Sequence, residues 1–334
     1  MIQQMTEQQL IEQLTRDIVL QQPSSIKGVG DDAAVVAHND RHTLVASNML
    51  LEGVHFDLTY TPLKHLGYKA AVVNFSDIAA MNGLPRQLLV SMGVSAKMTV
   101  DKIEEIYSGI RLACEHYNVD IVGGDTSTSL TGLTLSLTAI GVCAPEQITY
   151  RTGAQPTDLL CLTGSLGAAY MGLLLLEREK KVFEAGGKQP QLQGYDYVIE
   201  KYLKPKARVD MVESLHEEGL VPSAMIDISK GLAADTLLLC EQSKVGARLY
   251  TERIPIAHDT NAAAQEMNLN PMTAVLNGGE DYELLFTLPV ALHDKIKNLG
   301  KVDIIGHIVA AEQGCCLVSQ TGEDIPLTTI STTA

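Results

Sequence analysis

The stretch Gly28-Val29-Gly30-Asp31-Asp32-Ala33-Ala34-Val35-Val36 places two adjacent carboxylates at a glycine turn, directly before an apolar run. The glycines permit tight or positive-φ backbone, and Ala-Ala-Val-Val is typical of a buried strand. Asp31 and Asp32 are therefore expected at a strand end, where carboxylate oxygens can bind a hard cation. On these residues alone, a polar turn without a ligand is the commoner explanation.

Similar carboxylates recur at other predicted strand or helix ends. They are Asp77, Asp125, Asp227 and the pair Glu280-Asp281. Carboxylates that come together repel one another and raise each other's pKa unless cations neutralise them. Mg²⁺ prefers a few carboxylates, waters and substrate phosphates over a full protein cage. Acidic ends beside Gly-rich loops therefore indicate metal–nucleotide chemistry.

Composition narrows the class of protein. The 334 residues include 46% hydrophobic and 19% charged residues, with a formal net charge of −15. This length suits two α/β domains or one large one. Without a Lys/Arg stripe, the acidity argues against binding nucleic acid or an anionic membrane. The sequence predicts no secretory signal and no transmembrane run, and its six cysteines lack metal-binding spacing. We therefore expect a cytoplasmic protein with reduced thiols.

Hydrophobic periodicity predicts an alternation of strands and helices, an α/β (α+β) chain. Predicted helices run from Thr6 to before Pro23 and over 66–81, 100–117, 168–180, 205–218 and 230–242. Predicted strands cover 33–37, 43–47, 87–95, 120–123, 134–142, 158–163, 247–251 and 282–288, and 183–195 is expected to be an exposed loop. On the helix 66–81, Asn74 and Asp77 share one face and aim at a common point. The periodicity lapses near Pro145, which predicts domains 1–146 and 147–334.

Six segments in this order and spacing resemble the thiamine-monophosphate kinase family over nearly the whole chain. They are Gly30-Asp31-Asp32-Ala33, Glu52-Gly53-Val54-His55-Phe56, residues 73–81, Gly123-Gly124-Asp125-Thr126, Arg151-x-Gly153-Ala154 and Gly278-Gly279-Glu280-Asp281-Tyr282-Glu283-Leu284. The resemblance implies the two-domain fold shared with aminoimidazole ribonucleotide synthetase, with an N-terminal domain that dimerises through a barrel-like sheet. It also implies transfer of the γ-phosphoryl group of ATP to thiamine monophosphate, assisted by several Mg²⁺ ions.

The same resemblance implies roles for individual residues. Implied positions of the Mg²⁺ site are Asp32, Ser47, Asn48, Asp77, Asp125 and Asp227. Implied ATP contacts are Tyr107, Gly124, Asp125, Arg151 and Ser229. His55 and Glu280 are implied contacts to thiamine phosphate, and Asp227 and Lys230 are implied at the reaction centre. As alternatives, Tyr107 could be a helix-face residue, His55 a strand histidine, Arg151 a surface ion pair and Glu280 a turn residue.

The chain departs from the family pattern at three places. Ser47-Asn48 stands where the family has Thr-Asp, and Lys230 stands where it has the second Asp of Asp-x-Ser-Asp-Gly. The family's C-terminal Gly-aromatic segment is replaced by Thr328-Thr-Ile-Ser-Thr-Thr-Ala334, and the chain has no Trp. Asp to Asn adds one positive unit and Asp to Lys adds two, so the metal cluster is three units more positive.

These departures leave three hypotheses open. In the first, Lys230 replaces one metal ion, because an ammonium can neutralise a phosphate oxygen as a point charge, and the chain is a slow kinase. In the second, the chain is a catalytically impaired paralogue that binds nucleotide or thiamine phosphates. In the third, it is an ATP-dependent enzyme with another small-molecule acceptor, against which His55 and Glu280 weigh.

Overall fold

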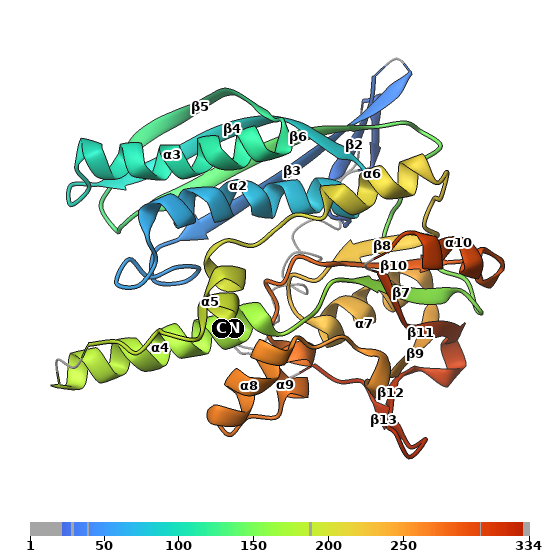
Figure 1. Cartoon of the computed structure of the whole chain (residues 1–334). Helices are drawn as coiled ribbons and strands as arrows, with labels where there is room; N and C mark the ends of the chain where they lie inside the picture. The colour runs from blue at the N-terminus through green and yellow to red at the C-terminus, as the bar shows by residue number, and fades with distance from the viewer. Residues whose placement is uncertain (1–21, 28–29, 39, 187–188, 301, 330–334) are drawn as a thin grey trace, which may run out of the picture.

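The structure, a computed structural model, describes residues 22–27, 30–38, 40–186, 189–300 and 302–329 (Figure 1). The helix predicted from Thr6 lies outside these residues, as does the end of the C-terminal segment. In the described part of the chain, no helix has the length and apolar character needed to cross a membrane.

The first half folds into a six-stranded sheet covered on one face by two helices. In spatial order its strands are β1 (Ser25–Lys27), β2 (Ala34–His38), β3 (Arg41–Leu51), β6 (Thr134–Cys143), β4 (Leu84–Ser95) and β5 (Asp120–Ser129). The β4–β5 pair is parallel and the other pairs are antiparallel. Side chains alternate along each strand, so Leu44 and Ala46 face the helices while Ser47 and Met49 lie on the exposed outer face.

Helices α2 (Leu63–Ala80) and α3 (Val100–Tyr117) cover the inner face of this sheet and pack closely together (Figure 1). Glycines at the contact make the close approach possible. A Cβ on Gly67 would lie 2.0 Å from the carbonyl oxygen of Ile106, and one on Gly109 would lie 1.8 Å from that of Lys64. The close contact helps to bury α2.

The second half builds a seven-stranded sheet. In spatial order its strands are β13 (Asp324–Pro326), β12 (Cys315–Val318), β9 (Val245–Tyr250), β11 (Val302–Ala310), β7 (Leu159–Thr163), β10 (Leu284–Leu288) and β8 (Ala224–Asp227). Its helices are α4 (Ala168–Gly186), α5 (Asp196–Leu203), α6 (Val209–Glu217), α7 (Leu232–Ser243), α8 (His258–Glu266), α9 (Pro271–Asn277) and α10 (His293–Asn298), with short 3₁₀ turns at Thr251–Arg253, Val290–Leu292 and Ala311–Gln313.

One hydrophobic core joins the two halves. It includes the inner face of the first sheet, helices α2 and α3, residues of α6, and Met225 and Phe286 from the second sheet. On the opposite face of the second sheet, Leu160 and Ile226 pack with α7 in a separate core. Helices α2 and α6 therefore lie between the two sheets (Figure 1). The predicted boundary at 146 falls in the connection between β6 and β7, but because the main core crosses it, the division into domains stays a prediction.

The structure corrects several predicted elements. The helix predicted over 168–180 continues to Gly186, so the loop predicted over 183–195 begins too early. The helix predicted from Pro205 begins only at Val209. The preceding residue, Arg208, donates side-chain hydrogen bonds to Asp210 and Glu283. Strands β3 and β5 run on to Leu51 and Ser129. The predicted elements do not include helices α5, α8, α9 and α10 or strands β1, β8, β11, β12 and β13. Apart from β11, these segments are short and carry few periods of any pattern.

Candidate functional site

Three carboxylates from distant parts of the chain meet between the two sheets. One oxygen each of Asp32, Asp77 and Asp227 lies within 4.8 Å of the others. Asp32 comes from the turn before β2, Asp77 from the last turn of α2, and Asp227 ends β8. All three were expected at element ends, and the fold brings those ends together. Oxygen donors grouped in this way suit a hard cation such as Mg²⁺.

Burial and mutual repulsion disfavour the ionised forms of these carboxylates. Burial, followed by the charge of Asp32, raises the pKa of Asp227 to about 7. Burial, followed by the charge of Asp227, raises the pKa of Asp77 well above its usual range. The hydroxyls of Ser76 and Ser229 donate to Asp227 and oppose its shift. A cation bound among the three carboxylates would favour their ionised forms.

Arg151 supplies one positive charge to the cluster. Its Nε and Nη2 donate to Asp32 Oδ2 and Oδ1 over 2.8 and 2.7 Å, a bidentate pair. The backbone N–H of Arg151 donates to Asp31 Oδ1 over 3.2 Å. Asp31 thus fixes the loop that carries Arg151, and its pKa rises to about 6, first by burial and then by the charge of Asp32. We expected both Asp31 and Asp32 at a cation site. In the structure, Asp32 joins the carboxylate cluster, whereas Asp31 binds the backbone of Arg151.

Asn48 is the common point at which Asn74 and Asp77 aim. Its backbone N–H donates to Asn74 Oδ1 over 3.0 Å, and its Nδ2 donates to Asp77 Oδ2 over 2.6 Å. The shared face predicted for the helix is therefore confirmed. Ser47, one residue earlier on β3, points to the outer face, where its hydroxyl contacts Leu137 O and Thr138 Oγ1. The structure does not bring that hydroxyl to the carboxylate cluster.

The segments around Asp227 and Glu280 are joined by backbone hydrogen bonds. The N–H groups of Glu280 and Tyr282 both donate over 3.0 Å, to the carbonyls of Ser229 and Ile228 respectively. Gly279 has φ +74°, and a Cβ there would lie 2.5 Å from the carbonyl oxygen of Ser229. Positive φ also occurs at Glu280 and Tyr282, an unfavourable conformation that functional sites often retain.

Lys230 is exposed in the turn that precedes α7. Its backbone N–H and that of Gly231 both donate over 3.0 Å to Asp235 Oδ2. Burial, followed by the charge of Asp227, raises the pKa of Asp235 to about 8. Sequence reasoning missed Asp235, although an acidic residue in the first turn of a helix was a usable signal.

Glu280 accepts a hydrogen bond from Lys69 Nζ over 2.8 Å. Burial raises the pKa of the neighbouring Tyr282 well above its usual range, and the charges of Glu280, Asp227 and Asp77 add to the shift. Tyr282 is therefore close enough to Glu280, Asp77 and Asp227 for their charges to act on it. His55 lies in the exposed turn after β3, where its Nδ1 accepts from the backbone N–H of Leu51 over 3.1 Å.

Three of the expected ATP contacts lie away from the cluster. Tyr107 follows Ile106, which contacts Gly67 of α2, ten residues before Asp77 and roughly three helical turns away. Strand register aligns Asn48 with Leu137, Val90 and Gly124 in turn, so Gly124 is three strand spacings, roughly 14 Å, from Asn48. Asp125 follows on the same exposed edge strand. Within a single copy of the chain, Tyr107, Gly124 and Asp125 therefore do not reach Asp77.

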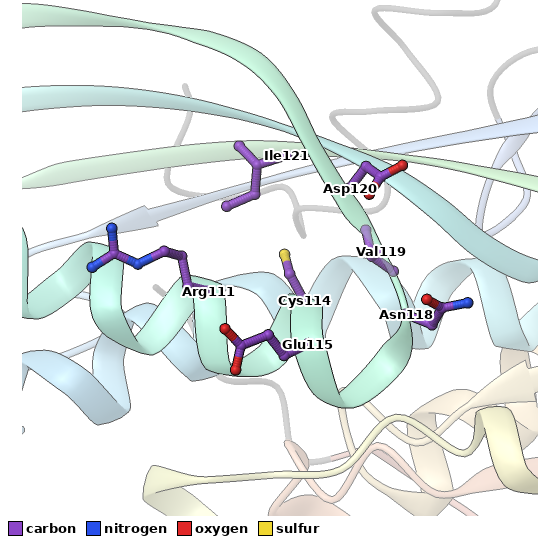
Figure 2. Close-up of a pocket in the computed structure, with 7 residues that line it drawn as sticks. All are labelled: Arg111, Cys114, Glu115, Asn118, Val119, Asp120 and Ile121. Carbon is purple, nitrogen blue, oxygen red and sulfur yellow. The ribbon is translucent and has the colours of Figure 1, made fainter.

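A surface pocket of about 330 Å³ lies close to these three residues, between α3 and the start of β5 (Figure 2). Its lining residues are Arg111, Cys114, Glu115, Asn118, Val119, Asp120 and Ile121. Arg111 follows Tyr107 by one helical turn, and Ile121 precedes Gly124 by three residues. Burial raises the pKa of Cys114 to about 12, so its thiol stays protonated.

Comparisons with known proteins agree with this architecture. Residues 30–143 match the family model described as AIR synthase related protein, N-terminal domain. The thiamine-monophosphate kinase of Aquifex aeolicus is 35% identical over 263 residues, which cover 79% of this chain and 81% of that protein. The thiamine-monophosphate kinase of Escherichia coli is 30% identical and covers 90% of this chain and 89% of its own length. The solved structure of AaThiL complexed with AMPPCP and TMP matches at 30% identity with a TM-score of 0.82, over 96% of this chain and 94% of that chain.

Proposed function

Because the chain belongs to the thiamine-monophosphate kinase family, we propose that Asp32, Asp77 and Asp227 hold the Mg²⁺ ions of its reaction. The protein is an ATP-dependent kinase that phosphorylates thiamine monophosphate to thiamine diphosphate. The observation that carries the assignment of the site is the meeting of these three carboxylates within 4.8 Å, at the ends of elements from both halves.

The residues present fit a magnesium site. The donors are oxygens, and burial together with the charge of Asp32 raises the pKa of Asp227, so a bound cation would favour its ionised form. Bound Mg²⁺ would neutralise the carboxylates and the phosphate oxygens together. Arg151 is held at the edge of the cluster by Asp32 and would offer a fixed positive charge to phosphates bound there. The hydroxyl of Ser229 donates to Asp227, which places Ser229 at the edge of the cluster.

The chemical step is a direct displacement. An oxygen of the acceptor phosphate forms a bond to the γ-phosphorus of ATP, the bond from that phosphorus to the bridging oxygen breaks, and ADP leaves with the electron pair. The attacking oxygen is already ionised at neutral pH, so the step needs no general base. Positioning and charge neutralisation are then the main requirements. Glu280 is the proposed contact to the acceptor, together with His55.

The level of kinase activity at this site depends on Asn48 and Lys230, which stand where the family has aspartates. The Asn48 amide donates to Asp77, where a carboxylate would repel it, so the present sequence relieves some of the crowding. Lys230 adds a positive charge near Ser229. We propose that these two residues form a working variant of the metal site, in which the Lys230 ammonium takes the place of one metal ion.

The test is formation of thiamine diphosphate from Mg-ATP and thiamine monophosphate by the wild type and by the Asn48→Asp/Lys230→Asp double variant. We expect wild-type turnover at or below the usual kinase range of about 1 to 100 per second. Lys97→Asp, on an exposed turn, is the matched control for the change of charge. Activity in the double variant alone would instead support an impaired paralogue, and ATP turnover without thiamine diphosphate would support another acceptor.

We also propose a cytoplasmic homodimer. Strand β5 is exposed along nearly its whole length, and the same region exposes Ile121, Val122 and Leu130. Tyr107, Gly124 and Asp125 lie on this side, away from the carboxylates, and a second copy would give them a partner surface. Val122→Lys is expected to turn the dimer into a monomer in light scattering. An unchanged mass would rule out this interface.

A further inference from the structure

Lys69 is a buried cation to which the sequence analysis gave no role. The residue lies on α2 and is only 4% exposed. A lysine is rarely buried to this extent unless its charge is paired, because desolvation of an ammonium is costly. Its partners come from the second half of the chain, so Lys69 links the helix that carries Asp77 to the loop that carries Glu280.

Two contacts fix the ammonium. Nζ lies 3.9 Å from the centroid of the Tyr202 ring on α5 and donates over 2.8 Å to Glu280 Oε2. Tyr202 is itself buried. A cation held on an aromatic face and by a charge-assisted hydrogen bond has little freedom to move. The position of Lys69 therefore sets the position of the Glu280 carboxylate.

Glu280 needs such support. Its backbone takes φ +59°, and its side chain remains 30% exposed beside the buried Lys69. An exposed glutamate on an unfavourable backbone would otherwise sample several rotamers. With Oε2 bound to Lys69, the rest of the carboxylate is presented to solvent as a hydrogen-bond acceptor.

The spacing along α2 separates the Lys69–Glu280 pair from the carboxylate cluster. Lys69 precedes Asp77 by eight residues, a rise of about 12 Å. If Glu280 contacts the acceptor, as proposed above, an acceptor whose phosphate lies at the carboxylate cluster would place its nitrogen heterocycle near Glu280. The amino group of that heterocycle is a hydrogen-bond donor, which suits a carboxylate oxygen.

We propose that Lys69, supported by the Tyr202 ring, is a positioning residue that holds Glu280 as the hydrogen-bond acceptor for the amino-substituted ring of thiamine monophosphate. The inference rests on the proposed function of the site. It assigns Lys69 to recognition of the acceptor and not to binding of ATP.

The experiment compares steady-state constants of the wild type, Lys69→Met and Lys204→Met. Lys204 is the matched control, since its Nζ lies 5.4 Å from the ring centroid of Tyr68 in a similar contact. In Lys69→Met we expect KM for thiamine monophosphate to rise about 10- to 100-fold, with KM for ATP unchanged and kcat little affected. Lys204→Met should match the wild type. An unchanged KM for thiamine monophosphate, or an equal rise in both KM values, would overturn the proposal.

A second variant keeps the test decisive if Lys69→Met folds poorly. Lys69→Arg retains the charge, but a planar guanidinium cannot reproduce the position of the ammonium between Tyr202 and Glu280. We expect a selective rise of roughly 3- to 10-fold in KM for thiamine monophosphate. Constants equal to those of the wild type would again overturn the proposal.

Calorimetric titration with thiamine monophosphate separates this inference from the proposed function. If the wild type forms no thiamine diphosphate, the proposed function fails, and binding of thiamine monophosphate then tests Lys69 directly. The same 10- to 100-fold weakening is expected in Lys69→Met. Equal affinity in the two proteins, or no binding by the wild type, would overturn the role of Lys69.

Discussion

Glu283 lies three residues after Glu280 but has a different role. It is 4% exposed and accepts hydrogen bonds from Thr163 Oγ1 over 2.7 Å and from Arg208 Nη1, with Lys201 Nζ at 3.4 Å. Arg208, 7% exposed, also binds Asp210. Glu283 therefore joins β7 to the segment before α6 and anchors the loop that presents Glu280.

Arg208→Met is expected to destabilise the protein strongly. The change leaves a buried carboxylate without its main cation, which typically costs about 3 to 5 kcal/mol. Urea unfolding measures the loss. The control is Arg248→Met, which breaks the more exposed pair with Asp324 and should cost at most about 1 kcal/mol. Equal losses in the two variants would contradict the assigned role of Glu283.

Asp281 makes stability depend on pH. It accepts from the N–H groups of Gly167 and Ala169 at the start of α4, and burial is the main cause that raises its pKa from 3.8 to about 7. The folded state holds the proton more tightly, so its stabilising contribution is fully present below pH 4 and is lost as the pH rises through 7. This difference in pKa corresponds to about 4 kcal/mol.

We therefore expect the free energy of unfolding to fall less between pH 5 and pH 8 in Asp281→Asn than in the wild type. Urea unfolding at the two pH values gives the comparison. Asp294→Asn is the control, because the Asp294 side chain is 99% exposed, and it should follow the wild type. A wild-type slope in Asp281→Asn would show that the titrating group lies elsewhere.

At the scale of elements, α2 organises the site. It carries Asn74, Ser76 and Asp77 toward the carboxylate cluster and Lys69 toward Glu280, so its position sets both ends of the site. The contact with α3 through Gly67 and Gly109 fixes that position on the sheet. A glycine at such a contact is a packing requirement.

Gly109→Ala tests this requirement. The new Cβ would fall 1.8 Å from the carbonyl oxygen of Lys64, so the helices must separate. We expect a loss of about 1 to 3 kcal/mol in unfolding free energy, together with lower kinase activity. Gly186→Ala is the control, since no atom lies within 4 Å of its added Cβ, and it should change stability by at most about 0.5 kcal/mol. Wild-type stability in Gly109→Ala would rule out the close contact.

At the scale of the whole molecule, the site lies where the two sheets meet. Asp32 and Asp77 belong to the first half and Asp227 to the second, so a cation bound among them links the halves. Since a ligand that binds only the folded state stabilises it, Mg²⁺ at 100 times its Kd would add about 2.7 kcal/mol.

Mg²⁺ is therefore expected to raise the melting temperature, and EDTA to reverse the rise. Asp227→Asn should lose most of this response because it removes one carboxylate from the cluster. Asp303→Asn, at an exposed position on β11, should keep it. An equal response in the two variants would place the stabilising cation outside the cluster.

The sequence by itself determined the elements with long, regular patterns and the family to which the chain belongs. Helix α3 matches its predicted bounds, Val100–Tyr117, because its apolar spacing persists over five turns. The motifs around Asp32, Asp77 and Asp227 marked the residues that meet. The sequence also determined that the side chains of Asn74 and Asp77 point to a common residue, because positions three apart on one helix lie on the same face.

Only the tertiary structure decided which residues meet across the chain. Nothing in local periodicity states that Arg151 pairs with Asp32, that Lys69 reaches Glu280, or that Ser47 faces away from Asn48's partners. Such contacts depend on strand order and on the packing of α2 between the sheets, which are set by hydrogen bonds and burial between distant segments. For the same physical reason, Tyr107, Gly124 and Asp125, which the resemblance implied as ATP contacts, lie apart from the carboxylate cluster within one chain.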